Sequence, residues 1–298
     1  MLCGPAPGVS LAGEVRSFAW RSSLLPAFLL SLREGLEIAL LIGIILGSLR
    51  RVQRPELKQY VWLGAGSATA LSLVIALILY ALGASLQGQA EQIFEGLMML
   101  LAAGVLTWMI FWMQRQSRMI TMQLEAGVRQ ATLQSGGRAL FFVAFFAVMR
   151  EGIELALFLT ASAMTTDGLQ TIVGALLGLA GAAILGWGLY ASTLRLNVRS
   201  FFAVTSILLL FFAAGLVAHG VHELNEAGWI PPIVEHVWDI NPILDESSGV
   251  GMLLKTLFGY NGNPSLTEVL AYIAYFVLVL IGLKLAAFPA RPSPKAIS

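Results

Sequence analysis

Long apolar runs separated by short polar connections dominate the chain. Seven of these runs reach the length of about 20 residues that a helix needs to cross a membrane. They lie at residues 24–49, 60–84, 93–113, 139–164, 171–193, 200–220 and 267–288. Because backbone polar groups inside a bilayer must be satisfied within the spanning segment, the pattern predicts an all-α polytopic membrane protein with seven transmembrane helices.

The composition supports this interpretation and excludes several other classes of protein. Hydrophobic residues make up 57% of the 298 positions and charged residues only 12%, a balance typical of a chain that lies in a lipid bilayer. The formal net charge of +1 gives no basic surface for nucleic acid. The single cysteine, Cys3, excludes an intrachain disulfide and a metal site built on thiolates.

The distribution of basic residues predicts the orientation of the helices. Lys and Arg gather in the first, third and fifth connections and in the C-terminal tail, whereas the second and fourth connections have none and the sixth has only Lys255. The positive-inside rule therefore places the N-terminus outside a cell (inner or plasma) membrane and the C-terminus in the cytoplasm.

An internal repeat relates the first three helices to the next three. The sequence REGLE at 33–37 returns as REGIE at 150–154, LYA at 79–81 returns at 189–191, and AAG at 102–104 returns at 213–215. The offsets of 117, 110 and 111 are nearly constant, as in two copies of one unit. Since three is odd, the second copy is inserted upside down, which is the arrangement of many secondary transporters.

These observations predict two inverted three-helix repeats plus one C-terminal helix. The predicted segments are an extracytoplasmic extension (1–23), the first repeat (24–113), a cytoplasmic loop (114–138), the second repeat (139–220), an acidic extracytoplasmic loop (221–266), and the seventh helix with a cytoplasmic tail (267–298).

The two REGxE motifs bring charge into the middle of apolar helices. An ionisable residue there costs roughly 2.5–3.5 kcal/mol on insertion scales, whereas an i,i+4 ion pair returns only about 0.2–0.5 kcal/mol. Helical spacing puts both glutamates of a motif on one face, and the inverted repeats then turn the two faces toward each other. We therefore expect a metal site whose ligands are Glu34, Glu37, Glu151 and Glu154, with Arg33 and Arg150 as charge-balancing partners.

The ligand type restricts the metal without choosing it. Carboxylate oxygens, with no thiolate and no histidine in the motif helices, suit a hard or borderline cation, and magnesium, calcium, manganese and iron all meet that description. The protein is expected to be a permease and not an enzyme. A membrane-embedded carboxylate metalloenzyme is the weaker alternative, because such sites usually combine glutamates with Glu-x-x-His pairs.

Further candidates for the ion pathway lie near the outer surface. Glu95 in the third run would line an entry route, or it is an interfacial acid favoured by the helix dipole. At the outer end of the sixth run, four residues share helical spacing and would capture an incoming ion, or they form a solvated helix end: His219, His222, Glu223 and Glu226. The loop that follows holds six acidic residues, counted from Glu223, against Lys255 alone, which would concentrate cations.

The motifs resemble those of the oxidase-dependent iron permeases, the family of the bacterial Efe-type permease and the fungal high-affinity iron permease. That family carries Arg-Glu-x-x-Glu in the first and fourth of seven membrane helices. The resemblance also covers 93–113, 195–228 and 257–269 and is closest to the bacterial branch. It implies inward transport of iron as substrate, no permanently bound cofactor, the motif glutamates as iron ligands, and an extracytoplasmic ferroxidase or iron-delivery protein as partner. Lead and manganese remain alternative substrates.

Overall fold

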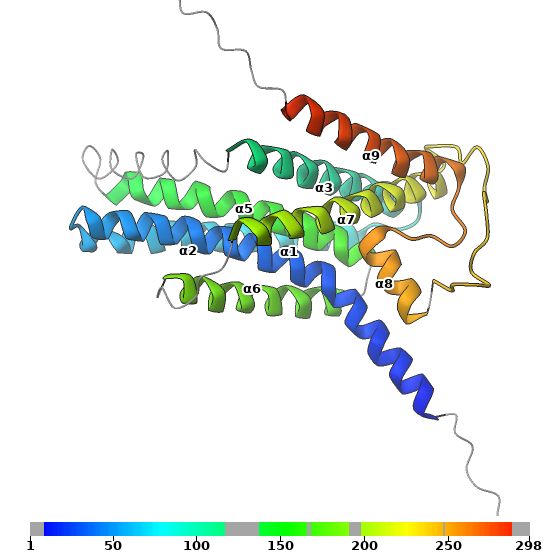
Figure 1. Ribbon diagram of the computed structural model, residues 1–298, viewed down its shortest axis with the longest axis horizontal. Helices are drawn as coiled ribbons and strands as arrows, with labels where there is room; N and C mark the ends of the chain where they lie inside the picture. Colours follow the sequence, from blue (N-terminus) through cyan, green and yellow to red (C-terminus); the bar gives the residue numbers. More distant parts are fainter. Residues whose placement is uncertain (1–8, 117–136, 166–167, 191–197, 247, 288–298) are drawn as a thin grey trace, which may run out of the picture.

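The computed structural model describes residues 9–116, 137–165, 168–190, 198–246 and 248–287, and every regular element in these ranges is a helix. The expectation of an all-α chain is therefore confirmed for the described residues (Figure 1). The elements are α1 (Val9–Arg51), the short 3₁₀ helix η1 (Pro55–Leu57), α2 (Lys58–Ser85), α3 (Gln89–Gln116), α5 (Gly137–Thr165), α6 (Gly168–Tyr190), α7 (Val198–Glu226), α8 (Gly249–Phe258) and α9 (Leu266–Ala287).

Five of the helical segments are long and apolar enough to cross a membrane: Pro55–Ser85, Gln89–Trp112, Gly168–Gly188, Ser200–Glu226 and Leu266–Leu285. The motif helices α1 and α5 have 43 and 29 residues, and each carries the three charged residues of its motif. Three parts of the predicted segments lie outside the described residues: positions 1–8 of the extension 1–23, most of the loop 114–138, and the tail after residue 287.

One helix boundary differs from the prediction, and one helix was not predicted. Helix α1 begins at Val9 instead of residue 24, and it runs through Pro26. Helix α8 was missed inside the loop 221–266, because its ten residues are too short for a search for spanning runs. Its end signals are nevertheless present: the Ser248 side chain accepts a hydrogen bond from the Gly251 N–H, and Gly259 ends the helix at φ 67°.

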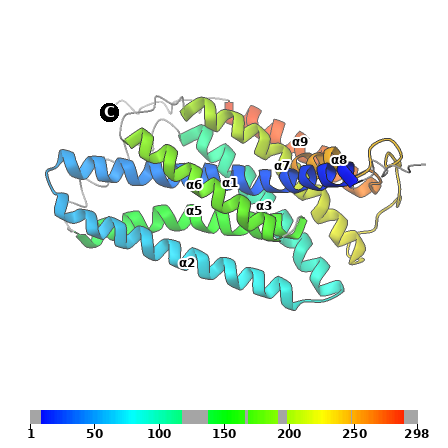
Figure 2. The ribbon, with the colours of Figure 1, turned by 90° about the horizontal axis from the view of Figure 1, so that it is seen from below.

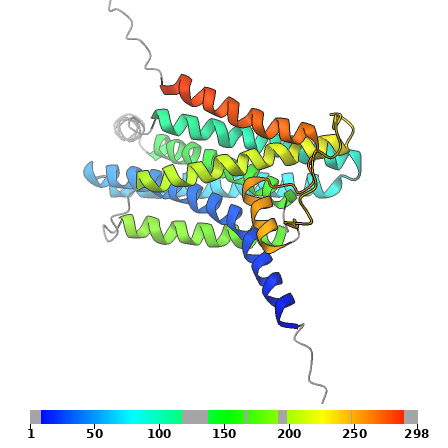
Figure 3. The same cartoon turned by 45° about the vertical axis from the view of Figure 1, so that its right-hand side comes forward.

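Three helix pairs, α1 with α6, α2 with α5 and α3 with α7, form the most extensive contacts of the bundle. Small residues permit this close packing. A Cβ atom at Gly64 would collide with the Phe141 carbonyl oxygen in α5, and one at Gly174 would lie 2.7 Å from the Leu24 carbonyl oxygen in α1. The motif helices are thereby held against α6 and α2, and α3 and α7 lie on the side of the bundle away from α6, with α9 packed on them (Figures 1 and 3).

The short helix α8 packs against α1 and α7. Its last residue, Phe258, lies with its ring centre 5.3 Å from that of Phe211, and a Cβ atom at Gly215 would lie 2.8 Å from the Gly259 backbone. A view turned by 90° shows α8 beside α7, at the end of the bundle where α3 begins (Figure 2). The loop after α7 therefore returns to the bundle wall before α9 starts.

Candidate metal-binding site

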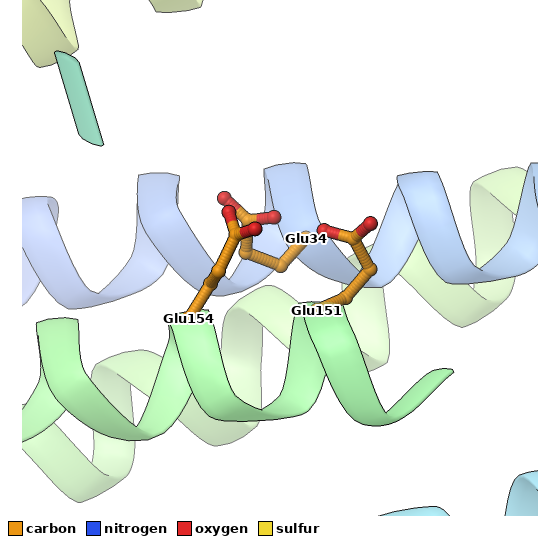
Figure 4. Close-up of side chains that lie close together, drawn as sticks. All are labelled: Glu34, Glu151 and Glu154. Atoms are coloured by element: carbon orange, nitrogen blue, oxygen red, sulfur yellow. The ribbon is translucent and has the colours of Figure 1, made fainter. Parts of the chain in front are cut away.

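Three glutamates from the two motifs meet at the contact between α1 and α5. One carboxylate oxygen each from Glu34, Glu151 and Glu154 lies within 4.8 Å of the other two. Their exposed fractions are 0%, 2% and 4%, so all three are buried. Figure 4 shows Glu34 reaching from α1 toward the two carboxylates that rise from α5. Among the described residues, this is the one group of His, Cys, Asp and Glu found with such spacing.

Local spacing and helix packing both contribute to this arrangement. Glu151 and Glu154 stand three residues apart on α5 and so share a face. The glycines of the motifs let a neighbouring helix approach from behind: Gly35 lies where a Cβ atom would be 2.6 Å from the Ala182 Cβ atom of α6, and Gly152 lies against the Ser72 side chain of α2. Each motif helix is thus pressed between its partner helix and the other motif.

Arg33 binds the acids of its own motif closely. Its Nη1 atom lies 2.7 Å from Glu34 Oε1, and its Nη2 atom lies 3.0 Å from Glu37 Oε1. Nη1 also donates to Met109 Sδ in α3 at 3.2 Å. Both acids of the first motif are thus paired with Arg33, but only Glu34 belongs to the group of three carboxylates; Glu37, which we also expected among the metal ligands, stands outside it.

Arg150 is placed differently. Its Nε atom donates to Glu154 Oε1 at 3.0 Å but lies 3.8 Å from Glu151 Oε1. The guanidinium centre lies 3.9 Å from the ring centroid of Trp112 and 5.8 Å from that of Trp108, both in α3. Sequence reasoning missed these tryptophans, because an aromatic residue in an apolar run indicates only packing.

Each of the three carboxylates has one oxygen that could bind a cation. The Oε2 atoms of Glu34, Glu151 and Glu154 are buried and accept no hydrogen bond. Buried carboxylate oxygens without a donor are costly, and either a proton or a metal ion can relieve that cost. With four glutamates and two arginines in the motifs, the formal charge is −2 when all are ionised. A hard or borderline cation suits this donor set.

Apolar side chains flank the three carboxylates along both helices. Leu30 lies one turn before Glu34, and Phe158 lies one turn after Glu154; both are fully buried and pack with Met99 and Leu106 of α3. Toward the other end, Ile42, Ile45, Leu140, Ala144 and Val148 form a second buried cluster with α2. The carboxylates are therefore enclosed between two apolar layers.

The residues expected at the outer end find separate partners. Helix α7 continues to Glu226, as their spacing required. His222 Nδ1 lies 3.0 Å from Glu268 Oε1 of α9, and His222 Nε2 lies 3.3 Å from Glu226 Oε1. Gln92 of α3 donates to Glu226 Oε2 at 2.8 Å.

The remaining candidates stand apart from this pair. His219 Nδ1 lies 3.0 Å from the Gly215 carbonyl oxygen of its own helix. Glu95 and Glu223 are partly buried. None of the five predicted pathway residues, Glu95, His219, His222, Glu223 and Glu226, joins a group like that of the three motif carboxylates. Glu268, which sequence reasoning missed, is buried and bonded to His222, Asn261 and Ser265.

Comparison with known proteins gives a consistent result. The model of the Iron permease FTR1 family matches residues 24–290. The chain is similar to proteins named ferrous iron permease EfeU from Shigella sonnei (strain Ss046) and Escherichia coli O157:H7. Each is 39% identical over 261 residues, which cover 87% of this chain and 94% of the relative. No solved structure matches the chain.

Proposed function

This chain belongs to the Iron permease FTR1 family, and from that premise we propose that it takes up iron through the carboxylates of Glu34, Glu151 and Glu154. The observation that carries the proposal is their convergence: three buried carboxylates from two helices, each with one oxygen that has no hydrogen-bond partner. Glu37 shares Arg33 with Glu34, and we propose that it serves as a fourth carboxylate during passage.

Ferrous iron is the proposed form of the substrate. The similar proteins are named ferrous iron permeases. A divalent ion would also neutralise the formal charge of −2 that the motif residues carry. Manganese(II) offers the same charge and a similar preference for oxygen, so it is the competitor against which selectivity should be measured.

The proposed architecture has seven spanning helices, with α1 and α5 added to the five apolar ones, and two inverted repeats. Equivalent contacts support the repeat: Gly64 of α2 lies against Phe141 of α5, and Gly174 of α6 lies against Leu24 of α1. Gly64 and Gly174 differ by the offset 110, and Leu24 and Phe141 differ by 117. The pairing of α1 with α6 likewise mirrors that of α2 with α5.

Transport would proceed by alternating access. Because apolar layers enclose the carboxylates from both ends, iron can reach them only after helices separate at one end. We propose that the closely packed pairs, α1 with α6 and α2 with α5, move as units against each other. Such a movement would separate Glu34 from Glu151 and Glu154 and so release the ion.

The proposed orientation places the start of α3 and the end of α7 outside, where the acidic loop lies, and the C-terminus in the cytoplasm. The basic residues also predict the side of three further segments. We place the extension 1–23 outside, and the loop 114–138 and the tail after the seventh helix in the cytoplasm. An extracytoplasmic ferroxidase or iron-delivery protein remains the proposed partner, and it rests on the resemblance of the motifs alone.

Iron uptake into proteoliposomes tests the proposal. We expect Glu34→Gln, Glu151→Gln and Glu154→Gln each to reduce ferrous iron uptake at least about 100-fold, because loss of an outer-shell group alone costs roughly 10–100-fold in metal affinity. The matched control is Glu56→Gln, which removes an acid that is more than half exposed in η1. Uptake close to that of the unchanged chain in all three variants, with normal insertion, would refute the proposed site.

A further inference from the structure

Helix α3 reaches the proposed iron site without contributing a charged residue to it. Trp112 stands one turn before the end of the helix at Gln116, and its ring lies 3.9 Å from the guanidinium centre of Arg150. This distance is well inside the range of about 6 Å over which an aromatic face attracts a cation. The contact joins a residue outside both motifs to one of the two motif arginines.

We propose that Trp112 is a positioning residue for iron transport: its ring holds Arg150 beside Glu154 and away from Glu151, so that the Glu151 carboxylate stays open for iron. The inference rests on the proposed function of these carboxylates. Trp112 acts through Arg150 and does not itself contact the ion.

The contacts of Arg150 support this role. A guanidinium has five N–H donors in a fork that matches a carboxylate, so an unrestrained arginine beside two glutamates tends to bind both. Arg150 makes one short contact, from Nε to Glu154 Oε1 at 3.0 Å, and stays 3.8 Å from Glu151. Its Nη2 atom is buried and donates no hydrogen bond. A donor that forgoes a nearby acceptor must be held by something else, and the Trp112 ring is the group in contact.

The first motif shows an arginine that binds both of its acids. Arg33 lies 2.7 Å from Glu34 Oε1 and 3.0 Å from Glu37 Oε1. If Arg150 bound both of its glutamates in the same way, it would compete with iron for their oxygens. The ring of Trp112 therefore determines how many carboxylate oxygens of the second motif are available to iron.

Uptake kinetics in proteoliposomes separate this role from simple packing. Trp112→Leu keeps a large apolar side chain without a π face, and Trp112→Phe keeps a π face. Because cation–π attraction is strongest in desolvated sites, we expect Trp112→Leu to raise the KM for ferrous iron about tenfold with little change in maximal rate, and Trp112→Phe to raise it no more than about threefold. Trp108→Leu is the comparison, since that ring is 5.8 Å away and 57% exposed; it should raise the KM less than Trp112→Leu does.

A second measurement avoids any loss of folding. Fluorinated tryptophan can replace all seven tryptophans of the chain, and it weakens the π face while keeping the shape. We expect fluorination to raise the KM of the unchanged chain and to leave that of Trp112→Phe unaltered. Equal effects of Leu and Phe at position 112, or equal shifts on fluorination with and without Trp112, would overturn the inference.

The two proposals fail in different ways. If the Glu154→Gln chain transports iron normally, the proposed site is wrong and the role of Trp112 falls with it. If uptake requires Glu154 but the KM is indifferent to the residue at position 112, only the role of Trp112 is wrong.

Discussion

The two REGxE motifs differ by one residue, Leu36 against Ile153, yet their surroundings differ greatly. In α1, Arg33 is fully buried, binds both acids of its motif and donates to a methionine sulfur. In α5, Arg150 remains 29% exposed, pairs closely with only Glu154 and stacks on Trp112. The first arginine therefore binds both acids of its motif, whereas the second binds Glu154 closely and leaves Glu151 at 3.8 Å. The difference arises from α3 and α7, which meet the two motifs with different side chains.

Replacing the two motif arginines should give the largest difference in protein stability. Arg33→Gln removes the partner of two buried carboxylates, and losing one side of a buried pair typically costs about 3–5 kcal/mol. Arg150→Gln should cost roughly 1–2 kcal/mol, because its side chain is partly exposed and its main contacts are one ion pair and one ring.

Thermal unfolding of both variants in detergent, compared at one pH, measures the difference between them. Equal losses of stability in the two variants would mean that the different contacts of the two arginines contribute equally to stability.

The glutamates should differ in transport. Glu154→Gln changes an acid of the three-carboxylate group, whereas Glu37→Gln changes one that is bound by Arg33. We expect the first to reduce iron uptake at least about 100-fold and the second roughly 10-fold, the lower limit for an outer-shell group. Iron uptake and binding by the purified protein decide the order. A larger loss for Glu37→Gln would assign it to the ligand group in place of Glu154.

The helix contacts at the two motif glycines should differ least in their contribution to stability. A Cβ atom at Gly152 would collide with the Ser72 side chain, and one at Gly35 would lie 2.6 Å from the Ala182 Cβ atom. We expect Gly152→Ala and Gly35→Ala each to cost about 1–3 kcal/mol through overpacking. Adding Ser72→Gly to the first, or Ala182→Gly to the second, should recover part of that loss in thermal unfolding.

Ser72→Ala alone provides the control for this pair. The substitution gives α2 an alanine where α6 has Ala182, since both residues face a motif glycine. It removes only a weak contact of 3.6 Å between the hydroxyl and Met149 Sδ. A loss below about 1 kcal/mol is therefore expected. If Ser72→Gly fails to relieve Gly152→Ala, the strain lies elsewhere than in this contact.

Several features of the fold and site could be predicted from spacing along the chain. Apolar run length predicted an all-helical chain, which the described residues confirm, and the i,i+4 spacing anticipated the ion pairs that Arg33 and Arg150 make with Glu37 and Glu154. Helix α8 escaped the same reasoning because a ten-residue segment in a polar loop has no distinctive run length. Glu268 escaped it because its bond to His222 joins residues 46 positions apart.

The sequence by itself determined which residues share a helix face, since helical periodicity is a local property of the chain. It therefore brought Glu151 and Glu154 together and put each arginine beside its own acids. Only the tertiary structure decided that Glu34 completes the group, that Glu37 stands outside it, and that Trp112 meets Arg150. These contacts depend on how each helix is rotated and shifted against its neighbours, and side-chain packing along whole helices sets that geometry.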